Sequence, residues 1–226
     1  LGNRSTSVFD AVGRRIASVS PLGFRATSIF DAAGQLEATI DPMGFRTTFG
    51  YDEAGNRNLV QDANGKLTTT TYASNRNLPL ATMDAMGFRT TYGFDSQSRL
   101  VTTMDARGGI VTNIYDSVGR LSIVKNQLGE NVRQYGYDLA GRIVTQMDAA
   151  NRCRTFTFDA AGQNTVTQYP DGGVVTNAYD ALGRRTTMTD WGGTSTYVFD
   201  ANNRMSSKTA SGYTQDYGYD ANGNRT

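Results

Sequence analysis

Aspartate is the residue through which this 226-residue sequence could do chemistry, because histidine is absent and Cys153 is the single cysteine. Without histidine the chain lacks the commonest general base, the commonest metal ligand and any Ser-His or Cys-His pair. Paired carboxylates could still hydrolyse glycosidic bonds, and Asp-Gly segments could bind calcium. The spacing of the aspartates decides between these chemistries and a structural role.

The aspartates recur along the whole chain. An aromatic residue followed by Asp returns every 20–22 residues, and Tyr72-Ala73 is a degenerate copy of this pair. A steady period is the signature of a repeat architecture, and the Gly-Gly-x-Gly-x-Asp calcium pattern is missing. Since a catalytic site is normally singular, we expect no enzyme activity, no metal site and no cofactor. The positions expected to be structural are Phe9, Asp10, Gly13, Phe30, Asp31, Gly34, Tyr51, Asp52, Gly55, Phe94, Asp95, Tyr115, Asp116, Gly119, Tyr137, Asp138, Gly141, Phe158, Asp159, Gly162, Tyr179, Asp180, Gly183, Phe199, Asp200, Tyr219, Asp220 and Gly223.

Each repeat contains two turns about ten residues apart, as in residues 52–55 (Asp-Glu-Ala-Gly) and 62–65 (Asp-Ala-Asn-Gly). At the first turn position the Asp side chain can accept a hydrogen bond from the backbone two residues on. At the fourth position Gly adopts a positive φ and forms a bulge. Asn203 replaces this Gly in one copy, and Asn tolerates the same conformation. The pattern predicts a chain reversal at every turn.

The segments between turns have the character of strands. Residues 67–72 and 88–94 are rich in Thr and aromatic residues, and Phe45, Thr47 and Phe49 alternate with polar neighbours. No segment shows helical periodicity. The predicted fold is all-β, an antiparallel β-hairpin repeat array with a period of about 21 residues. Because twisted sheets of more than about ten strands curl or split, we expect the array to coil into a β-spiral, shell wall or tube.

Arginine outnumbers lysine and recurs just after the first turn of the repeats. Arg57, Arg120, Arg142 and Arg184 are expected to lie over a neighbouring aromatic ring or to pair with the turn Asp. Two stretches break the pattern. Residues 72–79 lack both Asp and Gly and contain Pro79, so we expect a local loop or bulge there, and another near residues 169–173.

Composition limits the partners and the compartment. With 22 Lys+Arg and 21 Asp+Glu, the net charge of +1 gives no reason to expect nucleic acid as a partner. No apolar run approaches the roughly 20 residues of a membrane span. For two residues the sequence allows two roles each. Cys153 is a half-buried strand residue or a reactive thiol, and Trp191 is an exposed binding anchor or a cover folded over the sheet edge.

The repeats resemble those of the Rhs, or YD-repeat, family. The motif aromatic-Asp-x-x-Gly-Arg is clear at residues 115–120, 137–142 and 179–184. The resemblance implies a spiral of β-strands, which in bacterial Rhs toxins and toxin-complex subunits builds a hollow shell around a C-terminal effector, and in teneurins forms part of an extracellular adhesion protein. Residues 41–44 (Asp-Pro-Met-Gly) are similar to a signature of the family's self-cleaving protease, but they occupy an ordinary second turn.

These observations predict a structural segment of a large secreted or cell-surface protein, forming part of a shell or an elongated fibre. We expect residues 1–226 to be one continuous array without a separate domain, cut from a longer chain. The expected partners are further repeats of the same protein and an enclosed effector, with self-assembly through strand edges as a third option. The alternative is a module that binds glycans or another cell-surface protein through its periodic aromatic and Arg face.

Overall fold

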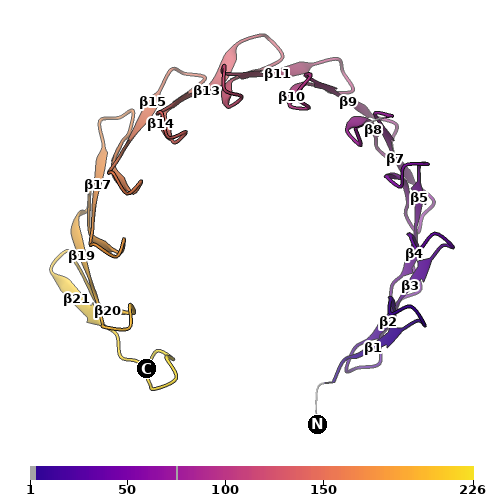
Figure 1. Ribbon diagram of the computed structural model, residues 1–226, viewed down its shortest axis with the longest axis horizontal. Helices are drawn as coiled ribbons and strands as arrows, with labels where there is room; N and C mark the ends of the chain where they lie inside the picture. Colours follow the sequence, from indigo (N-terminus) through magenta and orange to yellow (C-terminus); the bar gives the residue numbers. More distant parts are fainter. Residues whose placement is uncertain (1–3, 75) are drawn as a thin grey trace. The chain divides into compact units, whose positions relative to one another are not determined.

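A computed structural model describes residues 4–74 and 76–226. Within these residues the chain consists of strands and turns without a helix (Figure 1). This confirms the all-β prediction. The strands are β1 (Thr6–Phe9), β2 (Arg15–Val19), β3 (Arg25–Phe30), β4 (Leu36–Ile40), β5 (Arg46–Tyr51), β6 (Arg57–Gln61), β7 (Leu67–Tyr72), β8 (Pro79–Met83), β9 (Arg89–Phe94), β10 (Leu100–Met104), β11 (Ile110–Tyr115), β12 (Leu121–Lys125), β13 (Asn131–Tyr137), β14 (Ile143–Asp148), β15 (Cys153–Phe158), β16 (Asn164–Gln168), β17 (Val174–Tyr179), β18 (Arg185–Asp190), β19 (Gly193–Phe199), β20 (Met205–Ala210) and β21 (Tyr213–Asp216).

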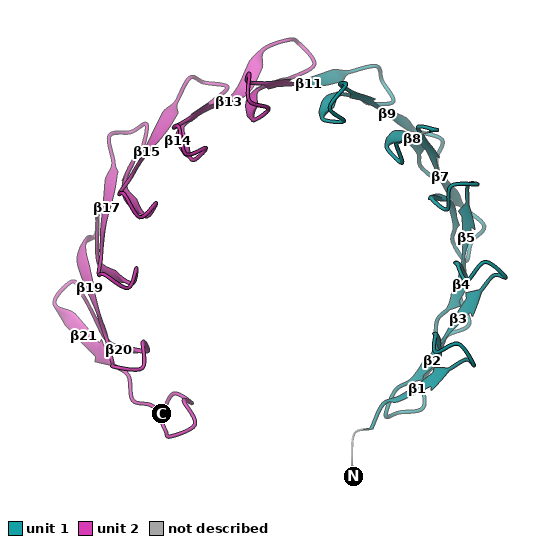
Figure 2. Cartoon of the chain, in the orientation of Figure 1, with its two compact units in different colours: residues 1–112 teal, residues 113–226 magenta. Residues whose placement is uncertain are grey.

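The strands follow one another in the sheet as they do in the chain. In unit 1, residues 1–112, β1 pairs antiparallel with β2, β2 with β3, and so on to β10 with the start of β11. In unit 2, residues 113–226, the same order runs from β12 to β21 (Figure 2). The antiparallel hairpin array is thereby confirmed. The expectation of one continuous array over residues 1–226 remains a prediction.

Neither unit has a hydrophobic core of the usual kind. The buried residues are three alanines and one threonine, and no large side chain is fully buried in the described part of the chain: Ala17, Ala38, Ala81 and Thr167. A globular domain buries its apolar side chains between two packed layers, whereas here a single sheet has two accessible faces. The ladder of backbone hydrogen bonds and the side-chain pairs across strands must therefore supply most of the stability.

Most turns have the predicted backbone, but the second turns at residues 190–193 and 210–213 are shorter, with two residues between the paired Asp190 and Gly193 and between the paired Ala210 and Tyr213. In the first turn the N–H of Asp10 donates to the carbonyl of Arg14 (3.0 Å), and the N–H of Gly13 donates to that of Asp10 (3.1 Å). The second turn at Asp41 has the same two bonds. At the fourth position of the first turns, glycine has φ between 80° and 91°, and Asn203 and Ser98 adopt φ of 63° and 65°. Ser98 was not anticipated from the sequence.

The two hairpins of a repeat differ in register. Across the first turn Phe9 pairs with Arg15, but Val8 pairs with Ala17, so Ile16 is an extra residue in the ladder. Across the second turn β2 and β3 pair without a shift. The repeat therefore contains a second bulge, opposite the aromatic residue, which the sequence pattern does not predict. A bulge bends its strand and increases the local twist, so it directs the first turn differently from the second.

The two irregular stretches behave differently. At residues 72–79 the turn is one residue longer, the N–H of Ala73 donates to the carbonyl of Leu78 (2.8 Å), and Asn77 has φ of 50°. The expected loop is confirmed, with Asn75 outside the described residues. The loop expected at residues 169–173 is wrong. The N–H of Tyr169 donates to the carbonyl of Gly173 (2.7 Å), as in a regular second turn, because Gly172 still supplies the positive φ.

Candidate functional site

The first turn gathers the charged groups of each repeat, and Asp116 shows the arrangement. Its Oδ1 accepts the backbone N–H groups of Val118 (3.0 Å) and Arg120 (2.8 Å). Its Oδ2 accepts Nε of Arg120 at 2.7 Å. The repeat places Arg four residues after Asp because the turn brings these two positions face to face. Both carboxylate oxygens are therefore engaged within five consecutive residues.

The same arginine reaches the following repeat. The Arg120 guanidinium lies over the ring of Tyr137, 4.4 Å from its centroid, and Nη1 donates to the carbonyl of Asp138 (3.0 Å). We call such an arginine, with its own Asp and the ring of the next repeat, a rung. Rungs with both the ion pair and the ring contact are Arg14 over Phe30, Arg120 over Tyr137, Arg142 over Phe158, Arg184 over Phe199 and Arg204 over Tyr219.

The prediction for arginine, contact with a ring or with the turn Asp, holds at all four positions. Arg120, Arg142 and Arg184 meet both partners, whereas Arg57 meets a ring alone. Asn56 occupies the rung position there, and its amide donates to the Asp52 carboxylate (3.0 Å). Arg57 begins β6 one residue later and lies over Phe49, 5.3 Å from the ring centroid, within its own hairpin. One residue of offset moves a strand side chain to the opposite face, which changes the ring it can reach.

Hydrogen bonding lowers the pKa of the rung aspartates. For Asp116 the largest cause is the backbone N–H of Arg120, and the side chain of the same arginine acts in the same direction against the effect of burial. In Asp52 the side-chain amide of Asn56 is the main cause of the lowered pKa. A carboxylate that is ionised at neutral pH and accepts bonds at both oxygens has no proton to donate as a general acid. These groups therefore do not suit the role of a general acid, and their hydrogen bonds are those of a turn.

No three His, Cys, Asp or Glu side chains in the described residues lie close enough together to hold a metal ion. Residues 41–44 form an ordinary second turn, in which Oδ1 of Asp41 accepts the N–H groups of Met43 and Phe45 at 2.9 Å each. None of the described residues belongs to a helix that could cross a membrane.

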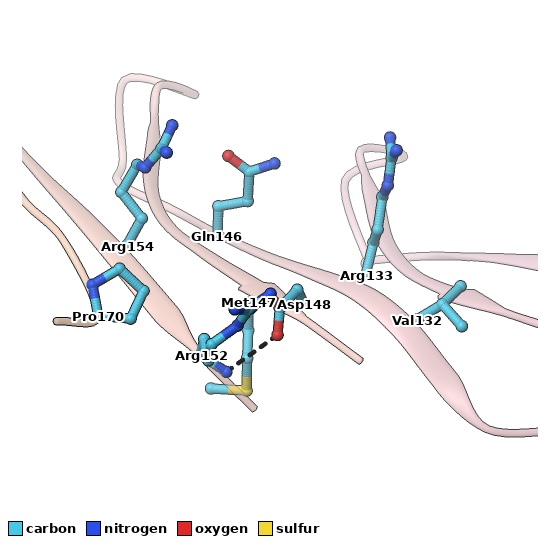
Figure 3. Close-up of a pocket in the computed structure, with 8 residues that line it drawn as sticks. All are labelled: Val132, Arg133, Gln146, Met147, Asp148, Arg152, Arg154 and Pro170. Carbon is cyan, nitrogen blue, oxygen red and sulfur yellow. Dashed lines mark hydrogen bonds and ion pairs between the residues drawn. The ribbon is translucent and has the colours of Figure 1, made fainter. Parts of the chain in front are cut away.

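A hollow of about 340 Å³ lies on unit 2, between β13, β14, β15 and Pro170 (Figure 3). Arg133, Gln146 and Arg154 point to the same side of the sheet in that view. In the ladder Gln146 pairs with Arg154 and Asp148 with Arg133. β13 begins with an extra residue at this point, since Lys125 pairs with Asn131 but Val124 with Arg133. The hollow thus coincides with an irregularity of the repeat.

Further arginines and aromatic residues lie beside this hollow. Asp148 forms an ion pair with Arg152 (2.7 Å), and this bond is the main cause of the lowered pKa of Asp148. Arg154 lies over the ring of Tyr169 (4.5 Å to the centroid), and Tyr169 meets Trp191 edge to face (6.1 Å between centroids). Trp191 is 80% exposed, so it is an exposed side chain and not a buried cover; its role as a binding anchor remains a prediction.

Cys153 is half-buried in β15, as expected of a strand residue. Its sulfur has no disulfide partner.

Comparison with known proteins agrees with the repeat analysis. The RHS Repeat family profile matches residues 30–66, 137–174 and 158–196. Among solved structures, the fold is similar to the Photorhabdus luminescens Tc holotoxin pore with the TccC3-D651A mutation (16% identity, TM-score 0.59, 98% of this chain and 15% of that chain). The fold is also similar to the TcdB2-TccC3-Cdc42 structure (16% identity, TM-score 0.59, 95% of this chain and 15% of that chain). For the TcdB2-TccC3 structure the identity is 16% and the TM-score 0.57, over 98% of this chain and 16% of that chain. No curated protein sequence matches the chain.

Proposed function

Since this chain carries RHS repeats and shares the fold of a stretch of Tc toxin structures, we propose that it is a structural wall segment of a large secreted or cell-surface protein. Its 226 residues correspond to about 15% of the length of those solved chains. In this proposal residues 1–226 act as one continuous array, and the repeat positions named above, from Phe9 to Gly223, have structural roles.

The observation that carries the proposal is the rung. In each rung the ion pair holds the arginine on its own turn, and the cation–π contact ties it to the next repeat; Arg120 adds a hydrogen bond to the following turn. A sheet without a core gains stability by adding such joints edgewise, as in other repeat proteins. Such a single sheet can serve as a wall, because its two faces remain accessible and can border two different spaces.

The wall is proposed to have no catalytic activity of its own. The rung aspartates are ionised and their oxygens are occupied by the turn, so their recurrence has a structural explanation. The resemblance to Rhs proteins supports further repeats and an enclosed effector as partners, and an extracellular location.

Electron microscopy of the longer protein that contains this segment tests the proposal. A closed hollow particle, with the repeats in its wall, is the expected result. Particles in which these repeats form a compact globule would contradict a wall, and filaments would favour the fibre form of the same structural role.

The hollow of Figure 3 favours a second candidate function, recognition of acidic glycans. Arg133 and Arg154 could bind a carboxylate through their planar guanidinium groups, and the exposed Trp191 could stack on a sugar ring. Trp191 is the only tryptophan, so its fluorescence reports on this site alone.

Titration with an oligogalacturonate, beside a neutral oligosaccharide of equal length, tests this candidate. We expect the acidic sugar to quench the fluorescence saturably. Arg154→Ala should weaken its affinity about tenfold, because the variant loses one good charged contact. Arg89→Ala, which removes an exposed arginine from unit 1, is the matched control. Equal responses to the two sugars would exclude the candidate.

A further inference from the structure

The second turns of unit 1 form an apolar edge. The third turn position carries Leu22, Met43 and Met86, which are 83%, 81% and 73% exposed. In these three turns the residue after the glycine is an exposed phenylalanine, whereas the turn at residues 105–108 has Arg107 and is followed by Gly109. We call these six residues the apolar edge: Leu22, Phe24, Met43, Phe45, Met86 and Phe88.

The fold of the turn does not require these side chains. In the turn between β6 and β7 the same two positions hold Asn64 and Lys66. That turn retains both backbone bonds, from the N–H of Asp62 to Lys66 and from that of Gly65 to Asp62 (3.0 Å each). Since polar residues serve the turn equally well, the apolar edge calls for another explanation, and rows of exposed apolar residues mark contact surfaces.

The spacing of the row indicates what kind of surface fits it. Leu22 and Met43 lie two strands apart, roughly 10 Å, and Met43 and Met86 lie four strands apart, roughly 20 Å. A partner with apolar groups at the same interval would match the row along its length. The first turns of unit 2 offer such a set at their third position, where Val118, Leu139 and Leu182 are 71%, 109% and 69% exposed.

The polar groups of the two edges do not oppose close contact. Oδ1 of Asp84 in the apolar edge accepts the N–H groups of Met86 and Phe88 (2.9 Å each), and Oδ1 of Asp180 accepts those of Leu182 and Arg184 (3.0 Å each). These acceptors keep their partners when water leaves, so the cost of desolvation is reduced.

Charge argues against a membrane as the occupant. The apolar edge is flanked by four basic residues and three aspartates: Arg25, Arg46, Lys66, Arg89, Asp41, Asp62 and Asp84. Arg46 also pairs with Glu37 (3.5 Å). An edge that is almost neutral has little attraction for an anionic bilayer.

We propose that the apolar edge of unit 1 docks on the first-turn edge of unit 2 in a second copy of this chain. The two edges are different surfaces, so the contact is heterologous. In a pair, one copy keeps its first-turn edge free and the other keeps its apolar edge free, so a further copy can add at either end. This goes beyond the structural role proposed above and does not depend on it.

Two triple variants test the proposal in the full chain. One carries Leu22→Asn, Met43→Asn and Met86→Asn, and the other Val118→Asn, Leu139→Asn and Leu182→Asn. Asn occupies the third turn position naturally at Asn64, Asn202 and Asn222, so both variants are expected to fold. Circular dichroism checks this.

Sedimentation velocity measures the association. We expect larger species of the unmodified chain as concentration rises, and association weakened about tenfold or more in each variant. An equimolar mixture of the two variants should form a one-to-one dimer, because each supplies the edge that the other lacks. Leu128→Asn, which removes an exposed leucine from a second turn of unit 2, should change nothing.

Three results would overturn the proposal. The unmodified chain could stay monomeric at its highest soluble concentration, whether or not it binds anionic vesicles. The Val118, Leu139 and Leu182 variant could still self-associate, which would show that the apolar edge pairs with itself. The mixture could remain monomeric while the unmodified chain associates.

Discussion

The joints between repeats differ between the two units. In unit 2 the rung position holds Arg120, Arg142, Arg184 and Arg204, with Gln163 as the exception before the last copy. In unit 1 three successive copies after Arg14 lack the arginine. They carry Gln35, Asn56 and, in the degenerate copy, residues 77–78.

Three joints that lack the arginine have a tyrosine hydroxyl bond, which Tyr137 and Tyr219 also make beside an arginine. The hydroxyl of Tyr51 donates to the carbonyl of Leu36 (3.0 Å), just after Gln35. Tyr72 donates in the same way to Arg57 (3.2 Å), just after Asn56. In unit 2 the one lost rung, at Gln163, is followed by the same bond from Tyr179 to Asn164 (3.0 Å). A joint can thus be closed by a guanidinium over the ring or by a hydroxyl at its end.

The joint after the degenerate copy has neither device. Phe94 lacks a hydroxyl, and no guanidinium lies over its ring among the residues that the structure describes. Arg76 makes a longer bond to the carbonyl of Ser96 (3.3 Å) instead. The comparison teaches that unit 1, which keeps the arginine ion pairs of Arg14 and Arg99, has tyrosine hydroxyl bonds alone at two joints, whereas unit 2 has an arginine at most of its joints.

The largest expected difference between the two units is the loss of stability in acid. Among the described residues the pKa is lowered for three aspartates of unit 1 and six of unit 2: Asp10, Asp52 and Asp95, and Asp116, Asp138, Asp148, Asp180, Asp200 and Asp220.

A lowered folded-state pKa means that the unfolded chain binds more protons in acid, so stability rises with pH. The contribution is complete above about pH 5 and is lost as pH falls through folded-state values below the ordinary 3.8. Hydrogen exchange of the full chain between pH 3 and 6, corrected for intrinsic rates, should show protection falling further in unit 2. Equal losses in both units would contradict the comparison.

Removing one rung should have the next largest effect. Arg142→Ala deletes the ion pair with Asp138, the contact with Phe158 and the bond to the Asp159 carbonyl. We expect a loss of about 1–2 kcal/mol in unfolding free energy by denaturant titration. Gln35→Ala changes the equivalent position of unit 1 and should lower the unfolding free energy by only a small fraction of that amount. Similar costs would show that the rung adds nothing beyond the turn.

Removing a tyrosine hydroxyl should affect the neutral joint more than the charged one. Tyr51→Phe deletes the bond to Leu36 and should cost about 1 kcal/mol. Tyr137→Phe deletes the matching bond to Leu121 (2.7 Å), but Arg120 still holds the ring. Hydrogen exchange in β5 should therefore rise more than in β13. A larger rise in β13 would contradict the idea of two interchangeable devices.

Building a rung in unit 1 is the smallest expected change. Asn56→Arg places a guanidinium between Asp52 and the ring of Tyr72, where Asn56 now donates to the carboxylate (3.0 Å). We expect a gain of about 0.5 kcal/mol, typical of an exposed cation–π contact, and less at high salt. Asn56→Gln, which keeps an amide, serves as the control. No gain over this control would show that the strand geometry of unit 1 does not admit a rung.

Most of the fold could be read from short segments. Asp10 and Gly13 define a turn within five residues, and the alternation of Phe49 and Tyr51 with polar neighbours defines the faces of a strand. The site was only partly predictable. Arg57, Arg120, Arg142 and Arg184 were expected to meet an aspartate or a ring. The last three meet both, whereas Arg57, which stands two residues after its turn Gly instead of one, meets a ring alone.

By itself, the sequence determined the turns, the strand direction and the repeat, because their causes lie within a few consecutive residues. Only the tertiary structure decided the bulge at Ile16, the ring reached by each arginine and the exposure of Trp191. These depend on how residues of neighbouring strands are registered, and a shift of one residue in a ladder moves a side chain to the other face of the sheet.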